Sequence, residues 1–170
     1  MRPPGLSGDG FFCYLNRDEL SPVWGITMNT PTPTERHDAF LREQLQRAGL
    51  RATRQRLGLA ELIFGQGERH LTAEGLYAEA LKEGMRLSQT TVYNTLHQFT
   101  EAGLLREILA DPRRIYFDTN VDPHHHFLDE DTGDMEDIPA EGVSVSTLPT
   151  PPDGKSIEGV DVIVRVRRSA

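Results

Sequence analysis

Four short amphipathic segments, each preceded by a hydroxyl side chain and followed by a glycine, constrain the fold of this chain more than any other feature. The hydroxyl residues suit N-caps, because they can accept a hydrogen bond from the first helical turn: Thr34, Thr53, Thr72 and Ser88. The glycines suit left-handed C-terminal positions: Gly49, Gly65 or Gly67, Gly84 and Gly103. Apolar residues recur between them at helical spacing: Phe40, Leu41, Leu45 and Ala48; Leu57, Ala60 and Phe64; Leu76, Ala80 and Leu81; Val92, Leu96 and Phe99. The sequence therefore predicts four helices between residues 34 and 103.

Two runs rich in aliphatic and aromatic residues follow the last of these segments. Residues 104–109 and 114–117 flank a turn at Asp111-Pro112, which predicts a β-hairpin. Short helices followed by a hairpin are the order of a winged helix-turn-helix. We assign that domain to residues 35–119.

The segment before this domain has a different composition. Residues 1–34 are rich in Gly, Pro, Ser and Thr, which predicts a disordered N-terminal arm. Met28 is a candidate for the true start of the protein, because the helical pattern begins shortly after it.

The segment after it, residues 120–170, predicts short strands. A short strand pair around Phe127-Leu128 and the Thr132-Gly133 turn leads to Asp137, and a further strand lies at 143–146. The last strand, at 160–166, carries valines on one face and arginines on the other. Strands so few and so one-sided bury little surface alone, which favours a partner subunit. We expect an α+β chain in which the winged helix-turn-helix is followed by a small α/β dimerisation domain.

Charge separates these parts of the chain. Residues 35–118 hold 12 Lys and Arg against 12 acids, whereas residues 119–170 hold four against eleven and carry most of the net charge of -8. Phosphates would therefore be tolerated in the middle of the chain and repelled by its last third, which would instead attract cations. No apolar run approaches the roughly 20 residues that span a bilayer, and the single Cys13 excludes an internal disulfide. We expect a cytoplasmic protein without a membrane partner.

A histidine triplet in the acidic third points to metal chemistry. His124, His125 and His126 are adjacent, with Asp118 before them and Asp137 after them. Imidazole and carboxylate donors together suit Zn, Fe or Mn. If the triplet lies on a strand, its first and third members point the same way and the second the opposite way.

The fourth predicted helix has a face suited to DNA. It turns Thr90, Tyr93, Asn94, His97 and Gln98 away from the core, and neutral hydrogen-bonding groups of this kind fit base edges and phosphates. Cations stand where a helix-turn-helix meets the DNA backbone: Arg51, Arg54 and Arg56, with Arg113 and Arg114 at the wing tip.

Four motifs, in this order, resemble the ferric uptake regulator family over roughly residues 36–138. They are Leu50-Arg51-Ala52-Thr53-Arg54-Gln55-Arg56-Leu57, His70-Leu71-Thr72-Ala73-Glu74, Gln89-Thr90-Thr91-Val92-Tyr93-Asn94-Thr95-Leu96 and the histidine triplet. The phrases YFDTN, HHHF and VRVRR are similar to the iron response regulator branch, the haem- and iron-responsive repressors of α-proteobacteria.

The resemblance implies a homodimer that binds double-stranded operator DNA. It implies a regulatory metal site at the domain junction, formed by His70, Asp118, His124, His126 and Asp137, and it associates the triplet His124, His125 and His126 with haem. It also implies DNA contacts by Tyr93 and Asn94 in the major groove and by Arg51 toward the minor groove. Together with the residues singled out above, the predicted DNA-contacting set is Arg51, Arg54, Arg56, Gln89, Thr90, Tyr93 and Asn94.

The departures from the family pattern narrow these expectations. Asp129 and Thr132 stand where the family's structural zinc site has its first Cys-x-x-Cys pair, so that site is not expected. No histidine follows His126, which leaves a second site that uses a late histidine incomplete. The branch's Cys-Pro haem motif is missing, because Tyr14 follows Cys13.

The leading interpretation is an iron- or haem-responsive repressor that is not an enzyme. A peroxide-sensing repressor of the same family is the nearest alternative, because it uses the same five-ligand pattern with Fe or Mn. A metal-dependent hydrolase is a rival from another class, but neither His-Glu-x-x-His nor a Gly-rich phosphate loop is present. A metal buffer or haem chaperone would leave the arginine cluster unexplained.

Overall fold

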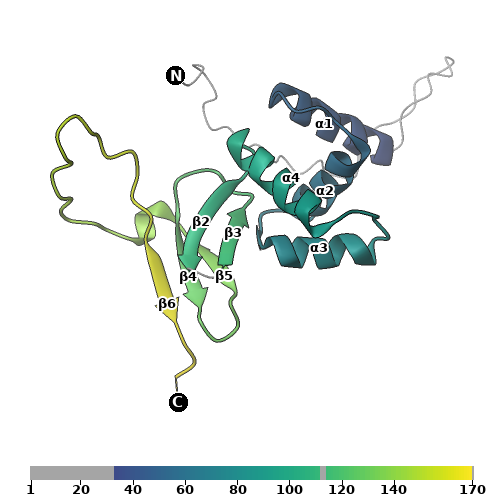
Figure 1. Cartoon of the computed structure of the whole chain (residues 1–170). Helices are drawn as coiled ribbons and strands as arrows, with labels where there is room; N and C mark the ends of the chain where they lie inside the picture. Colours follow the sequence, from purple (N-terminus) through teal and green to yellow (C-terminus); the bar gives the residue numbers. More distant parts are fainter. Residues whose placement is uncertain (1–32, 112–113, 170) are drawn as a thin grey trace, which may run out of the picture.

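The computed structural model describes residues 33–111 and 114–169. The predicted arm up to residue 32, with Cys13 and Met28, lies outside these residues, and so does Arg113. In the described part, four helices form one half of the molecule, and two small sheets extend from it (Figure 1).

The four helices form where the capping pattern predicts them. They are α1 (Pro33–Arg47), α2 (Arg54–Phe64), α3 (Ala73–Lys82) and α4 (Gln89–Glu101). The hydroxyls of Thr53, Thr72 and Ser88 each accept a backbone N–H from the first turn, which confirms three predicted N-caps. The fourth was wrong, because α1 already begins at Pro33, whose fixed φ suits a first helical turn. The glycines after α1, α3 and α4 adopt positive φ angles of 74°, 72° and 74°.

One apolar core joins the helices. Its largest fully buried members include Phe99, Phe117, Leu45, Leu59, Ile63, Leu76, Leu96 and Val92. Two predicted core residues are exposed instead: Phe40 keeps 39% of its surface and Leu81 49%. Both lie at the edge of their helical stripe, where periodicity alone does not say whether a neighbouring element arrives to cover the side chain.

The first sheet is the wing, and it has a third strand that the sequence pattern did not predict. Its strands are β1 (His70–Leu71), β2 (Arg106–Asp111) and β3 (Arg114–Asp118), in the order β1-β3-β2 with antiparallel neighbours. Register pairs His70 with Asp118, and Glu107 with Phe117. A two-residue strand is too short to produce a periodic signal, so only its non-local pairing reveals it.

The second sheet consists of β4 (His125–Asp129), β5 (Met135–Ile138) and β6 (Ile163–Val166), in the order β5-β4-β6. β5 pairs antiparallel and β6 parallel with β4. Its only helical element among the described residues is the 3-10 turn η1 (Ala140–Gly142). The strand predicted at 143–146 was wrong: this segment has no pairing partner and belongs to a long loop that projects from the sheet (Figure 1).

In the last strand, β6, the residue that packs inward is not one of the valines. Ile163, which lies between the valines, packs against the second apolar cluster, whereas Val166 on the valine face keeps 39% of its surface. That cluster combines Ile108, Ala110 and Tyr116 of the wing with Leu128 and Met135 of the second sheet.

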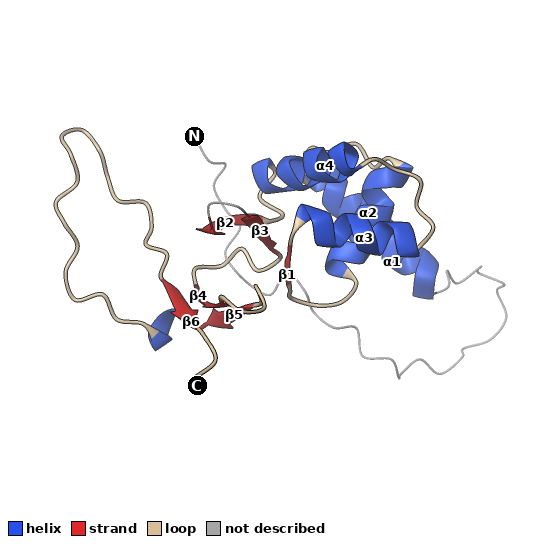
Figure 2. Ribbon diagram, turned by 60° about the horizontal axis from the view of Figure 1, so that its bottom comes forward, coloured by secondary structure: helices blue, strands red, loops and turns tan. Residues whose placement is uncertain are grey.

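The architecture is thus the predicted α+β arrangement, a winged helix-turn-helix followed by a small sheet. β1 lies between the helices and the sheets in Figure 2, so residues attached to it stand at the junction. Within the described chain, no helix is both long enough and apolar enough to cross a bilayer.

Candidate metal centre

Five side chains from both halves of the chain converge at this junction. One potential donor atom from each lies within 4.8 Å of all the others: His70 on β1, Asp118 at the end of β3, His124 just before β4, His126 on β4 and Asp137 on β5. Two of these residues come from the wing sheet and three from the second sheet, so a ligand held here would contact both sheets.

The three imidazoles present the same nitrogen to the two carboxylates. The Nε2 atoms of His124, His126 and His70 lie 2.8, 3.4 and 3.5 Å from Oδ2 of Asp118. The same atoms lie 3.5, 4.0 and 2.9 Å from Oδ1 of Asp137. Metal–donor bonds of roughly 2.1 Å place neighbouring ligand atoms about 3 Å apart, so these separations suit one shared ion.

Burial and tautomer prepare the imidazoles for that role. His124 and His126 keep only 6% and 1% of their surface. Nδ1 of His124 donates to the backbone carbonyl of Asp122 at 2.7 Å, which leaves Nε2 with its lone pair free. Nε2 of His70 and of His124 are buried without a hydrogen bond of good geometry, although carboxylate oxygens lie close by. Lone pairs that converge on a common point produce this pattern.

The electrostatics of the cluster keep its carboxylate charged. Burial alone would raise the pKa of Asp118, but the imidazoles of His126 and His70 beside it and the hydrogen bond from the backbone N–H of Asn120 lower it well below its usual value. Burial likewise opposes the charged form of His70, yet the nearby carboxylates of Asp118 and Asp137 raise its pKa. In the absence of a cation, the positive charge favoured on His70 offsets the negative charges of Asp118 and Asp137.

Residues that the sequence pattern did not single out hold the donors in place. Nη2 and Nη1 of the Arg69 guanidinium donate to the carboxylate of Glu79 on α3, at 2.6 and 3.0 Å. The backbone N–H of Arg69 also donates to the hydroxyl of Thr119 at 2.8 Å. His70 is therefore fixed to α3 and to the end of β3. Sequence reasoning had no signal for these contacts, since all of them join distant segments.

Asn120 links the two acids. Its backbone N–H donates to Oδ1 of Asp118 at 2.8 Å, and its side-chain amide donates to Oδ2 of Asp137 at 3.3 Å. Such second partners orient the oxygens that remain free. An asparagine two residues after an aspartate is a common turn pattern, so the sequence offered a weak hint here.

His125 does not join the cluster. It is half-buried on the other face of β4, where the backbone N–H of Val162 donates to its Nδ1 at 3.4 Å. The triplet is therefore divided between two faces, as strand alternation predicts. At the expected positions of a Cys-x-x-Cys pair, Asp129 instead accepts backbone hydrogen bonds from Asp131 and Thr132 and shapes the turn.

The donor set fits a divalent cation. Three imidazole nitrogens and two carboxylate oxygens, without sulfur, suit Fe, Mn or Zn. Five donors exceed the four of an ordinary structural zinc site.

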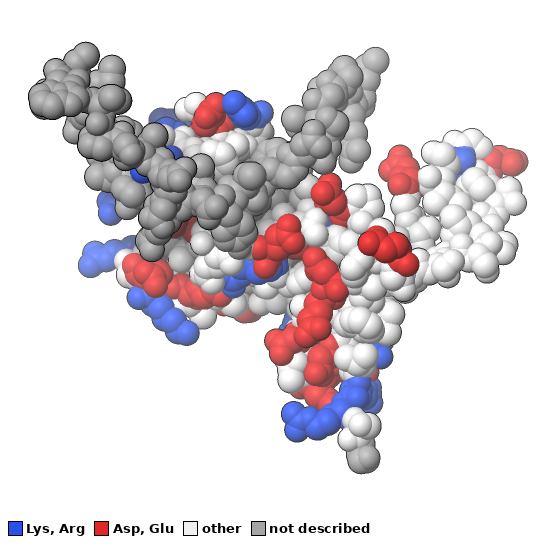
Figure 3. All heavy atoms as spheres, turned by 180° about the vertical axis from the view of Figure 1, so that it is seen from behind, with Lys and Arg blue, Asp and Glu red and all other residues white. Residues whose placement is uncertain are grey.

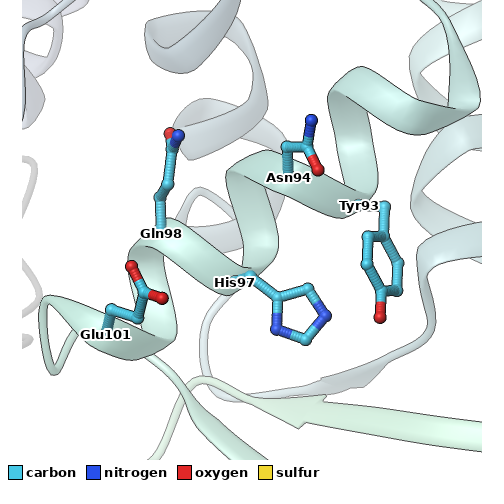
Figure 4. Close-up of a pocket in the computed structure, with 5 residues that line it drawn as sticks. All are labelled: Tyr93, Asn94, His97, Gln98 and Glu101. Atoms are coloured by element: carbon cyan, nitrogen blue, oxygen red, sulfur yellow. The ribbon is translucent and has the colours of Figure 1, made fainter.

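Most of the predicted DNA-contacting residues lie on accessible surface. Gln89, Thr90, Tyr93 and Asn94 on α4 are exposed, as are Arg51 and Arg54 before and at the start of α2. An open hollow of about 410 Å³ follows α4 and is lined by Tyr93, Asn94, His97, Gln98 and Glu101 (Figure 4). On the face in Figure 3, acidic side chains run over the C-terminal half, away from the helices.

Arg56, also expected to contact DNA, makes hydrogen bonds within the protein. Its guanidinium contacts Oε1 of Gln98 on α4 through two nitrogens, at 2.7 and 3.1 Å, and donates to the backbone carbonyl of Arg51 at 2.9 Å. A long basic side chain beside a helix readily finds such an acceptor. Arg56 therefore ties α2 to α4. Arg114 begins β3 at the tip of the β2–β3 hairpin, as expected, and its side chain lies against the turn at Gly133.

Comparison with known proteins identifies relatives of the chain. The model of the ferric uptake regulator family matches residues 47–148. A ferric uptake regulation protein of Cupriavidus metallidurans is 37% identical over 95 residues, which are 55% of this chain and 66% of that protein. The chain matches between 59% and 66% of the length of the first curated relatives.

Solved structures agree on the fold. The ferric uptake regulator of Pseudomonas aeruginosa with manganese aligns at a TM-score of 0.57 and 22% identity, over 76% of this chain and 98% of that one. The Vibrio cholerae ferric uptake regulator aligns at 0.59 and 20%, over 75% and 98%. Since the family model alone covers more than half of the sequence, the chain belongs to the ferric uptake regulator family, whose members are transcription regulators rather than enzymes.

Proposed function

We propose that this chain is a metal-responsive transcription repressor that binds operator DNA as a homodimer in the cytoplasm, with iron as its physiological signal. Family membership supports the class of function, and the curated relatives are ferric uptake regulation proteins. The sequence segments YFDTN, HHHF and VRVRR, which resemble the iron response regulator branch, support iron as the physiological signal. The manganese in the Pseudomonas aeruginosa structure supports Mn²⁺ as a laboratory probe.

One observation carries this proposal: the five donors come from both sides of the junction. His70 and Asp118 belong to the proposed DNA-binding domain, residues 35–119. His124, His126 and Asp137 belong to the proposed dimerisation domain, residues 120–170. A cluster confined to one domain could bind a cation without any effect on DNA.

The residues act by restraining the junction. A divalent ion, when bound, would supply the positive charge that the two carboxylates and three imidazoles share. His70 then restrains β1 and, through Arg69 and Glu79, α3; Asp137 restrains β5. A bound ion can change the affinity for DNA only under one condition. The five donors must surround the ion better in one relative orientation of the two domains than in another.

The structure favours an ion over haem at this position. His124 and His126 are buried, and His125 faces away from them, so the triplet does not form one open surface for a macrocycle. Peroxide sensing would use the same five donors. It would be recognised by mass spectrometry if peroxide added oxygen to His70, His124 or His126 in the iron-loaded protein.

The proposal is tested with the full-length protein. A duplex selected from a random-sequence pool by the wild-type protein in Mn²⁺ serves as probe, and its dissociation constant is measured at fixed salt with and without Mn²⁺. Replacing both His124 and His126 by Ala is expected to weaken Mn²⁺ binding by roughly 100-fold or more and to remove the Mn²⁺ effect on DNA.

The matched control is His125→Ala, which removes the third imidazole of the same triplet from the other face of β4. It should keep the Mn²⁺ effect within about threefold of wild type. Failure of the wild-type protein to select any duplex, or an undiminished response in the double variant, would refute the proposed function.

A further inference from the structure

We propose that His97 is a positioning residue that couples the metal centre to Tyr93, the exposed aromatic residue of the DNA-facing helix α4. The coupling runs from Asp118 through Phe117 to the imidazole of His97 and on to the phenol ring of Tyr93. It rests on the proposed function and names the contacts by which the metal centre affects DNA affinity.

The coupling begins in β3, because neighbouring residues of a strand face opposite sides. Asp118 faces the metal centre and keeps 1% of its surface; Phe117 faces α4 and is fully buried. The two side chains share one stretch of backbone, so a shift that fits Asp118 to a ligand also displaces Phe117. Close packing around a fully buried ring transmits even a small displacement to its neighbours.

His97 rests on two residues of the wing sheet. Its ring centroid lies 5.6 Å from that of Phe117 at an interplanar angle of 84°, an edge-to-face contact. Its Nδ1 lies 3.5 Å from Oε2 of Glu107. Glu107 and Phe117 are direct partners across the β2–β3 ladder. The imidazole of His97 therefore contacts both strands at the same level of the sheet. Its Nε2 is buried without a hydrogen bond.

Tyr93 completes the chain of contacts. It precedes His97 by four residues on α4, and the two ring centroids lie 4.3 Å apart at 60°. Figure 4 shows these two rings side by side on one side of α4, while Asn94 and Gln98 lie on another. Tyr93 still exposes 44% of its surface, so its ring is held by His97 and open to a ligand.

The polar contact that Gln98 makes on another side of α4 leads elsewhere. Gln98 is bound by Arg56, which belongs to α2 and carries none of the metal donors. Arg69 and Glu79 connect β1 with α3 and not with α4. His97 therefore joins the strand of Asp118 to the exposed surface of α4 through its contacts with Phe117 and Tyr93.

The test compares how strongly Mn²⁺ tightens binding of the selected duplex in wild type, His97→Ala, His97→Phe and Glu107→Gln. A coupling of this kind amounts to roughly 5- to 150-fold in affinity. In His97→Ala we expect the Mn²⁺ effect to fall to within about threefold of none, with Mn²⁺ affinity in the absence of DNA changed by less than about threefold. His97→Phe keeps both ring contacts and should restore much of the effect. Glu107→Gln should reduce it in part.

His37→Ala is the matched control, because His37 also pairs with a glutamate, Glu61 at 2.8 Å, but between α1 and α2. It should leave the Mn²⁺ effect unchanged. Equal weakening of DNA binding with and without Mn²⁺ in His97→Ala would show a merely structural role and overturn the inference, as would a full Mn²⁺ effect. If wild type itself shows no Mn²⁺ effect, the proposed function fails first and the inference with it.

Discussion

The helical half and the C-terminal half of this chain bury their apolar side chains in different ways. The helices contribute most of a large core, to which the wing adds Leu71 and Phe117, and in which Leu76, Leu96 and Phe99 are completely buried. The C-terminal sheet has a small cluster, and half of that cluster belongs to the wing: Ile108, Ala110 and Tyr116. One half is supported internally, whereas the other depends on its neighbour.

This difference explains where a signal can act. The C-terminal sheet has little apolar support besides the wing, so the contact between them depends on one small apolar cluster. The metal centre lies at the same junction, with donors from β1 and β3 on one side and from β4 and β5 on the other. A cation bound there would strengthen the contact that most needs support.

The largest effect is expected from a change in the helical core. Phe99→Ala should lower the free energy of unfolding by about 3–5 kcal/mol, because Phe99 is fully buried and the cavity cannot collapse easily. Urea unfolding followed by circular dichroism measures this, and amide exchange should show α1 to α4 losing protection together. Loss of protection in the C-terminal sheet alone would contradict a separate helical core.

A smaller effect is expected in the second cluster. Leu128→Ala should cost about 2–4 kcal/mol, toward the lower end because a small cluster relaxes more readily. Amide exchange should increase in β2 to β6 while α2 to α4 stay protected. Uniform loss throughout the chain would show that the two halves unfold as one unit and would remove the contrast between them.

Local chemistry made the helical half predictable. Thr53, Thr72 and Ser88 cap their helices through hydrogen bonds that span three residues, and such contacts are visible in the sequence itself. Strand alternation likewise predicted that His124 and His126 lie together and His125 apart. The family resemblance was needed for His70.

Non-local pairing limited the rest. β1 is two residues long and exists only because His70 pairs with Asp118, 48 positions later. The segment 143–146 alternates like a strand but finds no partner, and Ile163 rather than the valines packs inward. Pattern shows that a segment can pair, whereas the partner depends on the whole fold.

Binding of a cation should reduce the difference in stability between the helical half and the C-terminal half. At Mn²⁺ about 100 times its dissociation constant, the free energy of unfolding should rise by roughly 2.7 kcal/mol, with the gain in amide protection largest in β1, β4 and β5. Asp118→Asn should abolish the gain, because Asp118 lies within 3.5 Å of all three imidazole Nε2 atoms. A gain of equal size in Asp118→Asn would place the bound ion elsewhere.

The ion pair between Arg69 and Glu79 restrains His70 from the helical half. Weakening it should have a moderate effect on stability and on Mn²⁺ affinity. Glu79→Gln weakens the ion pair with Arg69, whose side chains are 32% and 20% exposed, and should cost about 1–2 kcal/mol. Mn²⁺ affinity should fall by roughly 10-fold, as expected for a partner that orients a ligand. Calorimetric titration measures it, with Glu74→Gln on the exposed face of α3 as control. Equal affinities in the two variants would show that Arg69 does not orient His70.

The smallest effect is expected at the hydrogen bond that joins the wing to the C-terminal turn. Tyr116 exposes only 4% of its surface, and its hydroxyl donates to the backbone carbonyl of Gly133 at 3.0 Å. Tyr116→Phe leaves that carbonyl without its partner and should cost about 1 kcal/mol. Tyr77→Phe on α3 removes a hydroxyl from the helical core and should change stability by less than about 0.5 kcal/mol. Amide exchange after Tyr116→Phe should rise first in the turn between β4 and β5, because the weaker half of the molecule responds to losses that the helical half absorbs. The same small change in both variants would mean that this bond does not help to hold the wing against the C-terminal sheet.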